Sequence, residues 1–86
     1  MDKNGLTKLI EECGELIQIA AKKSAFMHTD MHPDGTDMRD RMEDEIADVL
    51  AACDFVMKHF QLNQEAIFDR SRDKFRTFEK WHKLDD

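Results

Sequence analysis

Two pairs of acidic residues, each with its members three positions apart, are the groups in this chain best suited to chemistry. The first pair is Glu12 and Glu15, and the second is Glu45 and Asp48. Residues three apart on a helix are neighbours on its surface, so each pair brings two carboxylates together if its segment is helical. Oxygen ligands of this kind suit Mg²⁺, with Mn²⁺ as a second possibility. The pairs therefore predict a metal site made of all four residues.

The segments that carry these pairs have the periodicity of helices. Apolar residues recur at helical spacing before and after Pro33 and Gly35, which mark the clear break in the chain. A third periodic segment follows Asn63, a good helix N-cap. We predict helices over about residues 4–26, 37–60 and 63–83, with a loop at 27–36.

The predicted fold class is all-α, because no stretch alternates apolar and polar residues over the length of a strand. The 86 residues fit a single domain, residues 1–86, built as an antiparallel bundle of three main helices. Ile19, Phe55 and Phe68 lie off the main apolar stripes and leave a second apolar surface. We expect a homodimer or homotetramer to cover it and complete the bundle. The competing interpretation is a monomeric three-helix bundle with scattered exposed apolar residues.

The angular position of the acidic pairs favours a site over plain surface charge. With about 100° per residue, the main stripe of the first helix centres near Cys13, and both pairs fall at an apolar boundary. Like charges at this spacing repel, and a divalent cation would remove that penalty. The alternative is that the two pairs are ordinary solvated charge on a chain that is 37% charged.

Composition excludes several other classes of protein. Thirteen basic residues do not offset nineteen acidic ones, and the net charge of −6 argues against a nucleic-acid binder. The N-terminal residues contain no long apolar run, so we expect no signal peptide, no membrane span and a cytoplasmic location. Cys13 and Cys53 do not make a disulfide framework, and we expect two reduced, buried thiols.

The ordered set of motifs resembles the MazG-like all-α nucleoside triphosphate pyrophosphohydrolase superfamily. Its hallmark is Glu-x-x-Glu followed, after a variable gap, by Glu-x-x-Asp, which here reads Glu12-Cys13-Gly14-Glu15 and Glu45-Ile46-Ala47-Asp48. Asp73-Lys74-Phe75 in the third segment matches the later Lys-Phe element. The resemblance covers most of the chain, whose small size is like that of the compact single-domain members, including those carried by phages.

This resemblance implies an oligomeric helical enzyme. Mg²⁺ would be held by Glu12, Glu15, Glu45 and Asp48, and a nucleoside triphosphate would be cleaved between its α and β phosphates to the monophosphate and pyrophosphate. Two alternatives remain open at this point. The chain could be a non-catalytic helical oligomerisation or regulatory module, or the same fold could act on phosphoribosyl-ATP.

Several further residues are candidates for roles in that reaction. Glu12 or its neighbour Glu11 would orient the attacking water. The cationic side chains of Lys74, Arg76 and Lys22 could contact the phosphate tail from a neighbouring helix or subunit. Phe55 and Phe68 are candidates for stacking on the base, and His59 could touch the substrate. The loop from His28 to Thr36 is expected to be a mobile segment that could serve as a lid, rather than a zinc site.

Overall fold

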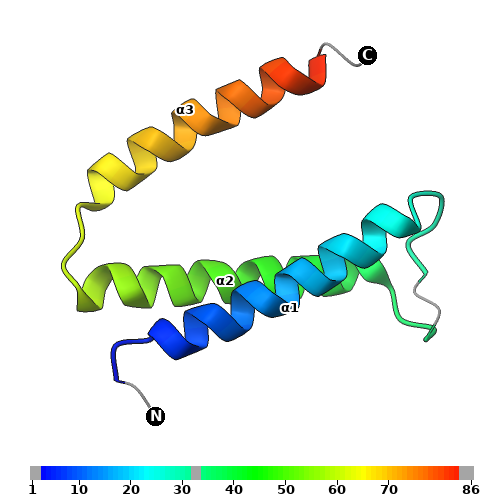
Figure 1. Cartoon of the computed structure of the whole chain (residues 1–86), viewed down its shortest axis with the longest axis horizontal. Coiled ribbons are helices and arrows are strands. Elements are labelled where there is room, and N and C mark those ends of the chain that lie inside the picture. Colours follow the sequence, from blue (N-terminus) through cyan, green and yellow to red (C-terminus); the bar gives the residue numbers. More distant parts are fainter. Residues whose placement is uncertain (1–2, 32–33, 84–86) are drawn as a thin grey trace.

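The computed structural model describes residues 3–31 and 34–83, and three helices account for most of them (Figure 1). The helices are α1 (Leu6–Ala25), α2 (Met38–His59) and α3 (Gln64–Lys83). Over the described ranges, β-pairing is limited to an isolated antiparallel bridge between Met31 and Asp37. The predicted all-α class is confirmed, and each helix lies inside the range expected from the sequence.

Helix α1 begins next to the far end of α2. Gly5 precedes the helix with a φ of 84°, in the left-handed region that glycine tolerates best. The Asn4 side chain accepts a hydrogen bond from the backbone N–H of Leu6 at 3.0 Å, so Asn4 contributes to the helix start. A Cβ at Gly5 would lie 2.6 Å from Cδ1 of Phe55. Only glycine therefore allows this close approach between the two helices without a shift.

Helices α1 and α2 form an antiparallel hairpin, and their contact holds the core of the chain. The buried apolar side chains are Ile19 from α1 and Met38, Ala52 and Val56 from α2. Ile19 and Met38 are fully buried, at the end of the hairpin near the loop. A core of this size leaves much of the apolar surface of a single chain exposed to water.

The loop between α1 and α2 is tied down at both ends. Lys23 Nζ donates to the backbone oxygen of Thr29 at 2.9 Å and forms an ion pair with Asp30 at 3.0 Å. The Asp37 side chain caps α2 by accepting from the N–H groups of Arg39 and Asp40. His32 and Pro33, which belong to the proposed lid, lie outside the described residues.

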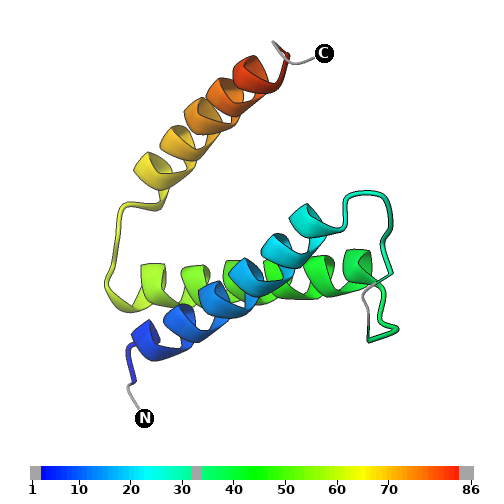
Figure 2. The same ribbon diagram turned by 45° about the vertical axis from the view of Figure 1, so that its right-hand side comes forward.

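Helix α3 stands apart from the hairpin in both views (Figures 1 and 2). The turn before it contains Gln61 with a φ of 53°, and Asn63 caps it by accepting from the N–H of Ala66 at 2.9 Å. None of the residues of α3 is buried, and Phe75 and Trp81 are 63% and 56% exposed. The predicted bundle of three helices is therefore not closed within one chain.

The side of α1 that faces α2 overlaps only partly with the predicted apolar stripe. Leu9, Cys13 and Leu16, at the centre and on one side of that stripe, are half-buried. Ile10 and Ile17, on its other side, are 72% and 68% exposed, whereas Ile19, expected off the stripe, is fully buried. The inward side is therefore rotated from the stripe centre towards Glu12, which is half-buried against α2.

Cys13 and Cys53 are free and half-buried, so they are thiols, although less buried than expected. Within residues 3–31 and 34–83, no helix combines the length and apolar character needed to cross a membrane.

Candidate metal centre

Three of the four predicted metal ligands come together between α1 and α2. Glu12, Glu15 and Glu45 each offer a carboxylate oxygen, and these three oxygens lie within 4.8 Å of one another. Glu12 and Glu45 are half-buried in the hairpin contact, and Glu15 is exposed. We call these three residues the carboxylate cluster. The Glu-x-x-Glu spacing puts two members on one side of α1, and the antiparallel packing of α2 brings the third opposite them.

The cluster contains two carboxylate oxygens that no hydrogen bond satisfies. Oε2 of Glu12 and Oε2 of Glu45 are both buried and have no hydrogen-bond partner among residues 3–31 and 34–83. Burial is the main cause that raises the pKa of Glu12, and the charges of Glu15 and Asp48 raise it further. Burial is also the main cause that raises the pKa of Glu45, followed by its interaction with Glu15. Burying an ionised, unpaired carboxylate destabilises a fold, so this arrangement calls for a cation.

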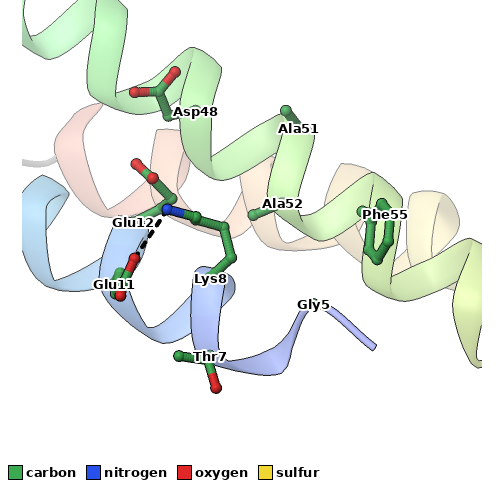
Figure 3. Close-up of a pocket in the computed structure, with 9 residues that line it drawn as sticks. All are labelled: Gly5, Thr7, Lys8, Glu11, Glu12, Asp48, Ala51, Ala52 and Phe55. Carbon is green, nitrogen blue, oxygen red and sulfur yellow. Dashed lines mark hydrogen bonds and ion pairs between the residues drawn. The ribbon is translucent and has the colours of Figure 1, made fainter. Parts of the chain in front are cut away.

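Asp48, the fourth predicted ligand, lies at the edge of the cluster. It is not among the three residues whose oxygens converge, but its negative charge contributes to the raised pKa of both Glu12 and Glu45. In Figure 3, Asp48 on α2 faces the Glu12 side of α1 across the hairpin. A set of four nearby carboxylates suits a hard divalent cation such as Mg²⁺, because such ions prefer oxygen ligands and keep further positions for water or phosphate.

A cavity of about 560 Å³ opens beside the cluster (Figure 3). Its acidic end contains Glu11, Glu12 and Asp48, and its other end is mainly apolar. The complete lining is Gly5, Thr7, Lys8, Glu11, Glu12, Asp48, Ala51, Ala52 and Phe55. The volume lies within the range of small-molecule sites in proteins, about 300–1,000 Å³.

The cation of this cavity is Lys8, which the sequence analysis missed. The Nζ of Lys8 forms an ion pair with Glu11 at 3.0 Å. This interaction is the main cause that raises the pKa of Lys8, and the charges of Glu12 and Glu15 raise it further. Lys8 could have been found from its spacing in the sequence. It precedes Glu11 by three residues and Glu12 by four, and both separations place side chains on the same side of a helix. Thr7 and Gly5 also line the cavity and were not predicted.

The three cations that were predicted lie elsewhere in the chain. Lys22 is in the last turn of α1, and Lys74 and Arg76 are on α3, where Arg76 forms an ion pair with Asp73 at 3.6 Å. None of the three lines the cavity.

The aromatic candidates are separated in the same way. Phe55 lines the cavity, whereas Phe68 is exposed on α3. His59 lies one turn beyond Phe55, with its ring nearly parallel to that of Phe55 and a centroid distance of 6.5 Å. The loop after α1 lies at the opposite end of the hairpin from the start of α1 (Figure 1).

Comparison with protein families agrees with this geometry. The model for the MazG nucleotide pyrophosphohydrolase domain matches residues 2–82 of the chain. Comparison with curated proteins and with solved structures gave no significant match.

Proposed function

The chain belongs to the MazG nucleotide pyrophosphohydrolase family, and from this premise we propose a specific reaction for it. Family membership indicates a nucleotide pyrophosphohydrolase in general. The reaction that we propose is Mg²⁺-dependent hydrolysis of ribo- or deoxyribonucleoside triphosphates between the α and β phosphates. The products are a nucleoside monophosphate and pyrophosphate.

The observation that carries this proposal is the carboxylate cluster with its two unpartnered oxygens. Glu12, Glu15 and Glu45 would hold the metal, with Asp48 as the fourth ligand. Bound Mg²⁺ would supply positive charge against the phosphate oxygens on which negative charge develops. The alternative, that the acidic pairs are ordinary solvated surface charge, does not account for two buried carboxylate oxygens without hydrogen-bond partners among the described residues.

In this proposal Glu12 is a metal ligand and Glu11 orients the attacking water. Glu12 points into the helix contact and has the unpartnered oxygen, which suits a metal ligand. Glu11 lines the cavity, beside Lys8, where it can orient the attacking water and accept its proton. Lys8 faces the same cavity and would pair with the phosphates.

We also propose that the active protein is a homo-oligomer. The chain measures 42 × 36 × 14 Å, so along its shortest axis it is little more than one helix thick. Its radius of gyration is 15.6 Å, whereas a compact domain of this length has a value of about 12 Å. A second copy of the chain would cover the exposed apolar residues of α1, α2 and α3 in a homodimer or homotetramer.

The reaction is tested by resolving the products of each common ribo- and deoxyribonucleoside triphosphate by ion-exchange chromatography, with Mg²⁺ and with EDTA. We expect monophosphate and pyrophosphate, lost with EDTA. Diphosphate and orthophosphate would mean that a different bond is cut. If no triphosphate is hydrolysed, phosphoribosyl-ATP is the next substrate to test. If Mg²⁺ also fails to raise the melting temperature, the chain is a non-catalytic module.

A further inference from the structure

The proposed reaction takes place at the phosphates, and the apolar end of the cavity has no role in it so far. We propose that Gly5, Ala51 and Phe55 form the nucleoside subsite, in which the base stacks on the ring of Phe55. This inference rests on the proposed function, because it places the nucleoside beside the metal ligands. It identifies the residues that bind the part of the substrate that is not a phosphate.

The cavity offers both kinds of contact that a nucleotide needs, charged groups for the phosphates and an apolar surface for the base. Asp48, Ala52 and Phe55 lie on successive turns of α2, and all three line the cavity. At a rise of 1.5 Å per residue, Asp48 and Phe55 are about 10 Å apart along the helix. A ligand with its phosphates at the carboxylates and Lys8 can therefore extend along the cavity to Phe55.

The lining at the Phe55 end suits a flat, weakly polar ring. Ala51 and Ala52 present only methyl groups, so they leave room above α2 that a larger side chain would fill. Phe55 is 54% exposed although its edge lies against Gly5, so the ring has surface available for a ligand. Bases stack favourably on aromatic side chains in many nucleotide sites.

Gly5 acts as a positioning residue for this ring. A Cβ there would approach Cδ1 of Phe55 to 2.6 Å and Cε1 to 3.1 Å, so any other residue would push the ring away. The start of α1 thus fixes where Phe55 stands, while the carboxylates further along α1 fix where the phosphates bind. One helix positions both halves of the ligand.

Titration calorimetry with substrate fragments tests the assignment without requiring turnover. The probes are dAMP, dCMP, dGMP and dTMP, which contain the nucleoside, and pyrophosphate, which does not, each in the presence of Mg²⁺. The variants are Phe55→Ala, Phe55→Tyr, which keeps a ring, and Phe60→Ala as a control. Phe60 is a partly exposed phenylalanine near the end of α2 that does not line the cavity.

We expect Phe55→Ala to weaken the binding of the best-bound monophosphate about tenfold, the scale of one base–aromatic stack. Pyrophosphate binding should not change, Phe55→Tyr should restore monophosphate binding, and Phe60→Ala should resemble the wild type.

Three results would overturn the inference. The first is an equal loss of affinity for monophosphate and pyrophosphate in Phe55→Ala, and the second is no loss of affinity for either. The third is that Phe55→Ala changes the sedimentation coefficient but not the affinity, which would make the cavity a contact between copies of the chain. Failure of the wild type to hydrolyse any triphosphate would instead count against the proposed function.

Discussion

Glu12 and Glu45 destabilise the metal-free fold at the proposed metal site, because each buries a carboxylate oxygen that has no hydrogen-bond partner among the described residues. Burial raises the pKa of both groups, and the neighbouring carboxylates raise it further. A raised carboxyl pKa means that the folded state resists ionisation more than the unfolded chain does. The metal-free protein is therefore destabilised when both groups are charged.

The first prediction concerns the pH dependence of the metal-free protein. As the pH falls through the raised pKa values towards the ordinary range for glutamate, the folded state takes up protons first, so this contribution to stability increases. We expect the Glu45→Gln variant to show a smaller increase than the wild type. The measurement is thermal unfolding followed by circular dichroism in EDTA over a pH series. Identical pH profiles for the two proteins would contradict the account.

The second prediction concerns Gly5, with Gly35 as a matched control. Both have positive φ angles, 84° and 89°, but a Cβ would meet Phe55 at Gly5 and open space at Gly35. Gly35→Ala should cost about 1 kcal/mol through backbone strain alone. Gly5→Ala should cost about 2–3 kcal/mol, because steric crowding adds to the strain. Urea unfolding of both variants measures the difference, and equal costs would show that the contact with Phe55 has no energetic weight.

At the residue scale, the sequence identified the acidic residues but not their surroundings. Glu12, Glu15, Glu45 and Asp48 could be found because helical spacing relates residues within each pair. Lys8 could have been found from the same spacing. The approach of Gly5 to Phe55 could not, because it joins two helices whose relative register no local pattern specifies.

At the scale of helices, local signals determine where each element starts and stops. Asp37 and Asn63 cap α2 and α3 through their side chains, and Asn63 was predicted to do so from the sequence. The side of α1 that packs inward was not readable in this way. The inward side includes the part of the predicted stripe with the half-buried Leu9 and Leu16, whereas the other part contains the exposed Ile10 and Ile17. Hydrophobic periodicity finds a helix, but it does not specify which part of a wide apolar stripe faces the partner helix.

The third prediction concerns the cap of α2. The Asp37 side chain accepts from the N–H of Arg39 at 2.8 Å and from that of Asp40 at 3.3 Å. Asp37→Ala should lower the free energy of unfolding by about 1 kcal/mol. Asp37→Asn, which keeps an acceptor oxygen, should retain most of the stability. Chemical denaturation distinguishes the two, and an alanine variant as stable as the wild type would show that the cap contributes nothing.

At the scale of the whole molecule, a single chain is too thin to enclose more than the small core of the α1–α2 hairpin. Its shortest dimension is 14 Å, and α3 buries none of its residues. Apolar side chains on the hairpin and on α3 therefore remain in water unless another copy covers them. Burial of apolar surface contributes about 25 cal/mol per Å², so association would supply stability that the single chain lacks.

The fourth prediction is that folding and association are linked. Because a second copy would stabilise the folded state by mass action, the melting temperature should rise with protein concentration. Leu50→Lys should reduce that dependence and lower the sedimentation coefficient, because Leu50 is an exposed apolar residue of α2. Glu43→Lys, which introduces the same side chain at an exposed charged position of α2, is the control. A concentration-independent melting temperature with a monomeric sedimentation coefficient would support the monomeric alternative.

The role of the carboxylate cluster is tested by the rate of Mg²⁺-dependent pyrophosphate release by Glu45→Gln, compared with Glu43→Gln. Glu43 is an exposed glutamate on α2 outside the carboxylate cluster. We expect Glu45→Gln to lose about a hundredfold or more in rate, the scale on which one charge-stabilising group acts. It should also lose the rise in melting temperature that Mg²⁺ gives, while Glu43→Gln keeps both. Normal turnover and a normal Mg²⁺ response in Glu45→Gln would contradict the account.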